Sequence, residues 1–190
     1  WHNFDERAYI RSASHFTAVA TRLQDGKKAL FTDLTGEKLT QVLIASCSMP
    51  FMMDPAPTPD GLCLDGGIAD SIPFDVAQEQ GYNKIVVIRT RDVSYRKKPS
   101  SRPVCQLYRR YFKDYPQFAE AGILRPEVYN QQVAQIEHLR RTGQIFNIAP
   151  QHPVKVGRVE SNVKKIQKLY ETGRQEAEQL LPSLIDYLNA

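Results

Sequence analysis

In Leu62-Cys63-Leu64-Asp65-Gly66-Gly67, a short apolar segment runs directly into an acidic residue and two glycines. The apolar residues predict a strand, and the ends of strands in α/β sheets are where ligands bind. Glycine has no Cβ, so the backbone at Gly66 and Gly67 can turn sharply and a partner can approach closely. A carboxylate at Asp65 could orient a nucleophile and accept its proton. Taken alone, the triplet also suits a plain turn in which Asp65 accepts hydrogen bonds from backbone N–H groups.

The residues before this triplet predict a hairpin, a helix and a loop. Residues 15–23 alternate and are β-branched, which predicts a strand, and Asp25-Gly26 favours a tight turn into a return strand over 28–32. A helical pattern follows Thr35-Gly36 and is closed by Pro50. The Pro-rich residues 54–61 predict a surface loop without regular structure.

The residues after the triplet alternate between helical and strand patterns. Helices are expected over 73–80, 106–113 and 126–142, and strands over 84–89 and 144–149. The apolar run of 84–89 is typical of a parallel strand that is buried on both faces. The C-terminal tract carries an apolar stripe that is expected to cover a sheet face, with a kink or break at Pro182. This alternation places the chain in the α/β class.

The composition is that of one soluble domain over residues 1–190. Hydrophobic residues make up 42% and charged residues 24% of the chain, which excludes a disordered or collagen-like chain. No apolar run approaches the roughly 20 residues that a membrane-spanning helix needs. Three widely spaced cysteines form neither a disulfide framework nor a metal site, so we expect a reducing, cytoplasmic location. No metal or cofactor is expected.

Several motifs occur in an order that resembles the second half of bacterial patatin-like phospholipases. They are Ala20-Thr21-Arg22-Leu23, Ala45-Ser46 followed by Pro50, Asp65-Gly66-Gly67 and Ser71-Ile72-Pro73. The resemblance is close over about residues 15–90. It implies the C-terminal portion of a three-layer α/β/α domain, in which residues 1–90 hold the sheet region with the acidic residue. Residues 91–190 would then form a helical extension with one short strand.

The resemblance implies a lipid acyl hydrolase that uses a Ser-Asp dyad without histidine. Asp65 matches the dyad base, Gly66 and Gly67 would shape the site, and the serine of the family lies in a Gly-x-Ser-x-Gly elbow. The 190 residues contain no such motif and begin at Trp1 rather than at Met. We therefore expect an N-terminally truncated protein that holds the base without the nucleophile and does not hydrolyse esters by itself. The alternative is a non-catalytic module derived from this fold that binds lipid or protein.

Two serines and the four histidines are weaker candidates for a catalytic role. Ser46 and Ser48 lie at the end of a predicted helix without flanking glycines, so neither is expected to be a nucleophile. A Ser-His-Asp triad would need a histidine beside Asp65. The four histidines have no metal-type spacing and are scattered over the chain: His2, His15, His138 and His152.

The segment Arg89–Lys113 carries nine basic residues and one acidic residue, with tyrosines between them. Basic residues mixed with aromatic ones suit an anionic membrane surface, and the resemblance to a lipase leads to the hypothesis that this segment makes peripheral contact with such a membrane. A solvated surface is the plain alternative, and nucleic acid is not expected because no binding motif accompanies the charge. A sheet edge left exposed would favour self-association, so a homo-oligomer is a further expectation.

Overall fold

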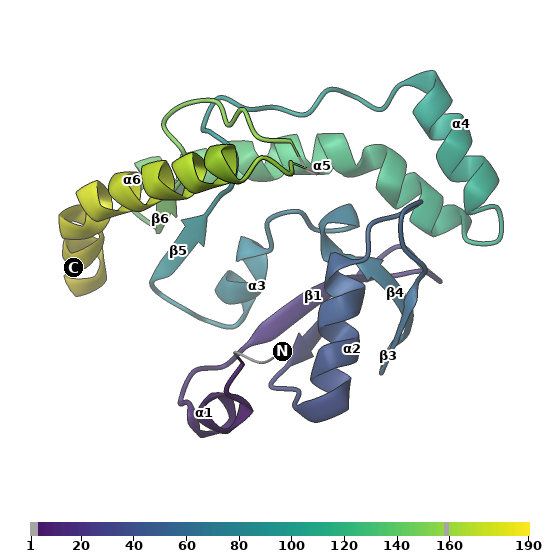
Figure 1. The fold of residues 1–190 in the computed structure, drawn as a ribbon, viewed down its shortest axis with the longest axis horizontal. Helices are drawn as coiled ribbons and strands as arrows, with labels where there is room; N and C mark the ends of the chain where they lie inside the picture. Colours follow the sequence, from purple (N-terminus) through teal and green to yellow (C-terminus); the bar gives the residue numbers. More distant parts are fainter. Residues whose placement is uncertain (1–3, 158–159) are drawn as a thin grey trace. The chain divides into compact units, whose positions relative to one another are not determined.

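The structure is a computed structural model that describes residues 4–157 and 160–190. Helices and strands alternate along the chain, which confirms the predicted α/β class. Two compact units make up the structure. Unit 1 comprises the residues up to Pro73 together with Lys98–Tyr129, and unit 2 comprises Phe74–Lys97 and Asn130–Ala190. Figure 1 labels the elements of both units.

Unit 1 is built on a four-stranded antiparallel sheet in the order β2-β1-β4-β3. Its strands are β1 (Thr17–Arg22), β2 (Lys28–Thr32), β3 (Ala56–Thr58) and β4 (Gly61–Asp65). The predicted β1–β2 hairpin is confirmed, with Gly26 at a φ of 66° in its turn. A Cβ at Gly26 would lie 2.6 Å from the Gln117 carbonyl oxygen, so both the turn and this close approach require glycine.

The prediction of a structureless loop over residues 54–61 is wrong. Ala56–Thr58 forms β3, which pairs with β4 at the edge of the sheet. An edge strand tolerates Pro57 because the N–H that proline lacks is not needed on the outer side of the sheet. The proline-rich composition therefore marks a sheet edge in this chain rather than the end of regular structure.

Helices lie against both faces of this sheet. Helix α2 (Gly36–Cys47) places Val42 and Ala45 on one face, where they pack with alanines of β1 and β2. On the other face, Leu64 packs in an aromatic cluster from helices α4 (Arg102–Tyr111) and α5 (Pro116–Arg141) and the turn between them. Helix α1 (Glu6–Arg11) precedes β1 and has no buried residue. Unit 1 thus has the helix–sheet–helix layering that the sequence predicts.

Unit 2 centres on a parallel strand pair, β5 (Ile85–Ile88) and β6 (Ile145–Ile148). Both strands agree with the sequence prediction, as does the parallel character expected of β5; that the two strands pair with each other was not predicted. The expectation that β5 is buried on both faces is wrong, because Ile85 and Val87 are buried while Ile88 is 73% exposed. A single partner strand and a single packed face explain this alternation. Helix α3 (Phe74–Glu79) precedes β5 and agrees with the predicted helix.

Two helices differ from their predictions. Helix α5 begins at Pro116 rather than near residue 126, so Pro126 lies inside the helix. Buried side chains on both sides of it, Phe118 and Tyr129, offset the cost of an interior proline. Helix α6 (Val163–Asn189) buries none of its residues, so the predicted role of its stripe as cover for a sheet face is wrong. Its main anchor is the Tyr187 hydroxyl, which lies 2.9 Å from the Ile85 amide nitrogen.

Candidate active site

The backbone of Asp65 is fixed at the end of β4 by two neighbouring segments, β1 and the end of α2. Asp65 pairs with Ala20 of β1, and its N–H donates to the Ser48 carbonyl oxygen at 2.8 Å. Its own carbonyl oxygen accepts a hydrogen bond from the Thr21 hydroxyl at 2.8 Å. The acidic residue is therefore placed by the sheet and by the end of α2, not by a free loop.

The Asp65 side chain is half-buried and has one engaged oxygen. Its Oδ1 accepts a hydrogen bond from the Gly67 N–H at 2.8 Å, which caps the short 3₁₀ helix η1 (Gly66–Ile68). Among the described residues, no cation forms an ion pair with this carboxylate, and its Oδ2 has no hydrogen-bond partner. The turn-capping role suggested by the triplet is therefore real, and it leaves one oxygen available to accept a proton.

Gly66 and Gly67 have different structural roles beside Asp65. A Cβ at Gly66 would lie 2.2 Å from the Val19 carbonyl oxygen, so the close approach of η1 to β1 requires glycine. A Cβ at Gly67 would lie 3.2 Å from Asp65 Oδ1 and 3.1 Å from Arg125 Nη2. Gly66 therefore permits the turn, and Gly67 permits the Arg125 guanidinium to lie close to the Asp65 carboxylate.

The sequence did not single out Thr21 or Arg125 as neighbours of Asp65. Thr21 is fully buried; its hydroxyl donates to the Asp65 carbonyl and accepts from the Ala69 N–H at 3.1 Å, which ties β1 to η1. In the sequence, the only feature that pointed to Thr21 was its position within the motif Ala20–Leu23. Arg125 lies on α5, and its guanidinium stands beside Gly67. No sequence signal marked it, because the helix was predicted to begin one residue later.

The other sequence candidates have no bond to the Asp65 carboxylate. Ser48 is buried, and its hydroxyl donates to the Ile44 carbonyl at 2.8 Å. The exposed His15 lies 2.6 Å from Asp33 Oδ2, and this hydrogen bond lowers the pKa of Asp33 below its ordinary value. Ser46 is half-buried, His138 and His152 belong to unit 2, and His2 lies outside the described residues. In the part of the chain that the structure describes, no histidine completes a triad at Asp65.

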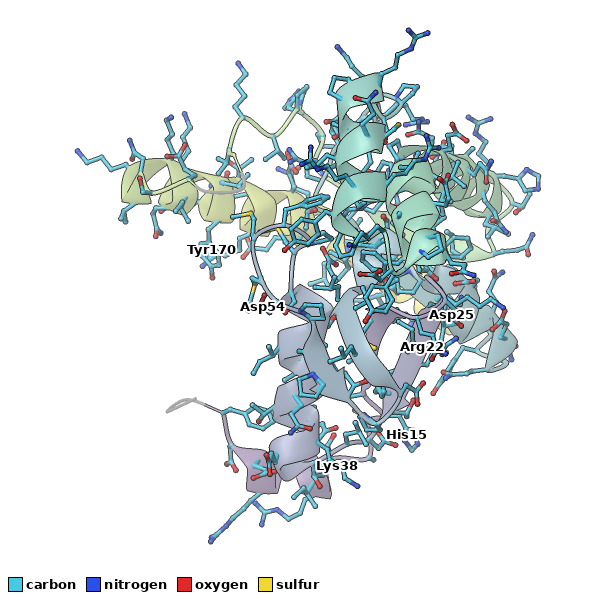
Figure 2. The ribbon with its side chains drawn as sticks, turned by 90° about the vertical axis from the view of Figure 1, so that its right-hand side faces the viewer. His15, Arg22, Asp25, Lys38, Asp54 and Tyr170 are labelled. Atoms are coloured by element: carbon cyan, nitrogen blue, oxygen red, sulfur yellow. The ribbon has the colours of Figure 1, made fainter. Side chains whose placement is uncertain are left out.

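The basic segment Arg89–Lys113 is not one uniform exposed surface. Arg89 is buried, with its Nε 3.1 Å from Asn147 Oδ1, and Arg109 forms an ion pair with Glu120 at 2.9 Å. Helix α4, in contrast, exposes Leu107 and Tyr111 to solvent. Figure 2 shows the side chains of this helix projecting from unit 1.

A separate cavity of about 340 Å³ lies in unit 2 between residues 150–156 and helix α6. Leu169, Thr172 and Gly173 of α6 form one wall, and His152 is part of the opposite wall. None of its lining residues belongs to the Asp65 neighbourhood. The geometry of Asp65, rather than the size of a cavity, therefore defines the candidate active site.

Fold and site together describe an α/β protein with an available carboxylate at the end of a strand. Residues 3–77 match the family model "Patatin-like phospholipase", and residues 115–189 match a domain of unknown function, DUF6363. No curated protein matches the chain. The first match contains the four motifs between Ala20 and Pro73, so it confirms that this part of the chain is patatin-like; the apolar strand near residues 84–88 lies beyond it. This likeness supports a hydrolase family in general.

Of the helices within residues 4–157 and 160–190, none combines enough length with enough apolar character to cross a bilayer.

Proposed function

We propose that Asp65 is the general base of a Ser-Asp dyad in a lipid acyl hydrolase. The observation that supports this proposal is the hydrogen bonding of the two oxygens of its carboxylate. One oxygen is held by the Gly67 N–H at 2.8 Å, and the other is free at the end of β4 among the described residues. The fixed oxygen orients the group, and the free oxygen can accept a proton. The patatin-like match over residues 3–77 supports the reaction class.

The proposed reaction needs a serine from a Gly-x-Ser-x-Gly segment outside these 190 residues. Asp65 takes the proton of that serine as its oxygen attacks the ester carbonyl carbon. The protonated Asp65 then gives the proton to the alcohol that leaves, and an acyl-enzyme remains. Asp65 next takes a proton from water, whose oxygen attacks the acyl carbon. The bond between that carbon and the serine oxygen then breaks, Asp65 returns the proton to the serine oxygen, and the fatty acid is released. No step requires a metal or a cofactor.

Hydrolysis of a p-nitrophenyl ester tests the dyad. The 190-residue chain is expected to give no turnover above background. A longer product of the same gene, read upstream to a Gly-x-Ser-x-Gly segment, is expected to turn over and to lose about 100-fold or more of its kcat in Asp65→Asn. Turnover by the 190-residue chain itself, abolished in Asp65→Ala, would show that the nucleophile lies within these residues and that this part of the proposal is wrong.

A non-catalytic module that binds lipid or protein is the second candidate. The observations that favour it are the lack of a Gly-x-Ser-x-Gly motif in the 190 residues and the exposed apolar side chains Leu107 and Tyr111 on α4. The upstream coding sequence separates the two candidates. A Gly-x-Ser-x-Gly segment that follows a predicted strand supports the hydrolase, and its absence supports the module.

A further inference from the structure

Arg125 lies next to the candidate base, and none of the residues that the structure describes accepts a hydrogen bond from its side chain. Its Nε is buried and has no partner, and none of the described residues forms an ion pair with its guanidinium. A guanidinium keeps its charge at any physiological pH, and a buried N–H without a partner is unfavourable. The residue is held in this place by α5, with the buried Phe118 and Tyr129 on either side of it in sequence.

The guanidinium and the Asp65 carboxylate face one small volume. The position of a Cβ at Gly67 lies 3.1 Å from Arg125 Nη2 and 3.2 Å from Asp65 Oδ1. Gly67 supplies no side chain to fill that position. Since all three residues belong to unit 1, this arrangement is a property of one compact unit.

We propose that Arg125 binds the phosphoryl group of the substrate, and so restricts the enzyme to acyl esters that carry a phosphate. The planar fork of N–H groups in arginine matches the oxygens of a phosphate. The carboxylate beside it repels an anion, so the phosphate lies on the Arg125 side of Gly67 and the ester on the Asp65 side. A phosphate and an ester joined through a short alcohol backbone fit this order. The identity of the substrate depends on the proposed function, whereas the binding of an anion by Arg125 does not.

Binding to the 190-residue chain tests the anion site without turnover. The probes are dihexanoyl phosphatidylglycerol below its micellar concentration, glycerol 3-phosphate, inorganic phosphate and the uncharged dihexanoylglycerol. Calorimetry gives the affinities, and the side-chain Nε–H signal of Arg125 in ¹⁵N NMR spectra, assigned by its loss in Arg125→Lys, reports contact. We expect that signal to shift with all three phosphates and to stay in place with dihexanoylglycerol. Tighter binding of the phospholipid than of either small phosphate identifies the lipid as the source of the phosphate.

Four variants separate charge from packing. Arg125→Gln is expected to weaken phosphate binding at least tenfold, while Arg7→Gln, a matched loss of an exposed arginine charge on α1, leaves it unchanged. Asp65→Asn is expected to tighten binding several-fold because it removes the repelling carboxylate. Gly67→Ala puts a methyl group into the shared volume, against side-chain ends that can shift, and is expected to weaken binding in a folded chain. Circular dichroism confirms folding of each variant.

Unchanged phosphate affinity in folded Arg125→Gln, or equal losses for the phosphates and dihexanoylglycerol, would overturn the anion site. These outcomes differ from a failure of the proposed function. Ester hydrolysis by the longer protein that does not depend on Asp65 would remove the dyad, and the binding measurements on Arg125 would still stand.

Discussion

Gly66 is the residue whose replacement the structure penalises most directly. A methyl group there would lie 2.2 Å from the Val19 carbonyl oxygen and 3.2 Å from the Ala20 nitrogen, both of which are backbone atoms of a central strand. Such atoms cannot move without displacing β1 or η1. We expect Gly66→Ala to lower the free energy of unfolding by about 3 kcal/mol, measured by urea denaturation. Gly67→Ala is the matched control and is expected to cost less than half as much; equal losses would contradict this account.

Thr21 holds the Asp65 turn through its hydroxyl. The replacement Thr21→Val keeps the shape but leaves the Asp65 carbonyl oxygen and the Ala69 N–H without this partner in a fully buried place. We expect a loss of about 1–3 kcal/mol in the free energy of unfolding, from buried polar groups that become unsatisfied. Thr17→Val is the control, because Thr17 bonds to Thr32 at the exposed surface of the same strand pair. A loss at Thr21 no larger than at Thr17 would show that the hydroxyl does not hold the turn.

The sequence indicates Asp65 as a site residue but not the residues around it. The strand and the two glycines are consecutive, so local pattern is enough to find them. Thr21 reaches Asp65 across 44 residues of chain because β1 and β4 pair, and the register of that pairing is not visible in either strand alone. Arg125 comes from a helix whose start was predicted too late. Contacts between distant segments thus define most of the candidate site.

Helix α5 carries an ion-pair cluster whose strength depends on pH. Arg140 and Arg141 lie within 3.3 Å of Glu137, and the hydrogen bond from Arg140 is the main reason that the pKa of Glu137 falls from 4.5 to about 2. A lowered pKa in the folded state stabilises the fold above pH 4.5, and this stabilisation is lost as the pH falls toward 2. All three side chains are partly exposed, so we expect about 1 kcal/mol or less.

The replacement Glu137→Gln measures this contribution. It is expected to lower the free energy of unfolding at pH 7 and to have a much smaller effect near pH 2, where Glu137 is protonated in the unfolded state and about half protonated in the folded state. Guanidinium chloride would screen the pairs, so urea denaturation is the suitable measurement. An effect of equal size at both pH values would mean that packing, not charge, accounts for the role of Glu137.

The main differences between the predicted and observed helices and strands occur at prolines. Local rules place proline at the first turn of a helix or in a loop, which led to a late start for α5 and to no strand at Ala56–Thr58. In the structure, tertiary packing decides. Gly122 of α5 lies so close to Tyr108 that a Cβ would be 2.2 Å from its Cε1, and this contact belongs to the stretch of helix before Pro126. Such close packing between helices is not encoded in the local pattern of either one.

At the scale of the molecule, the two family matches do not coincide with the two compact units. The patatin-like match ends at residue 77, just after unit 1 passes into unit 2, and the DUF6363 match begins at residue 115, inside unit 1. Helix α5 supplies residues to both units, and Arg125 lies in the part that belongs to unit 1. The proposed anion site therefore combines Asp65 and Gly67 from one match with Arg125 from the other. The DUF6363 match thus contributes Arg125 to the candidate site whose other residues lie in the patatin-like match.

A lipid substrate gives α4 a role at the membrane surface. The helix exposes Val104, Leu107 and Tyr111, which recur at helical spacing, and the Tyr111 ring packs on Phe51, next to the exposed Met52 and Met53. Arg110 and Lys113 are exposed on the same helix and just beyond its end. We propose that this surface, rather than all of Arg89–Lys113, contacts anionic lipid, because Arg89 is buried and Arg109 is paired with Glu120.

Vesicle sedimentation tests this contact. The chain is expected to bind vesicles that contain phosphatidylglycerol more tightly than neutral phosphatidylcholine vesicles at low salt, and to lose that preference at high salt. Each basic residue near such a surface contributes about 1 kcal/mol, so Arg110→Glu is expected to weaken binding about tenfold or more. Lys38→Glu, the same charge reversal at an exposed site on α2 (labelled in Figure 2), is expected to have little effect.

Leu107→Ser is expected to weaken binding to both kinds of vesicle at any salt concentration, because it removes an apolar contact. Equal binding of the unaltered chain to neutral and anionic vesicles at low salt would contradict the membrane role of α4.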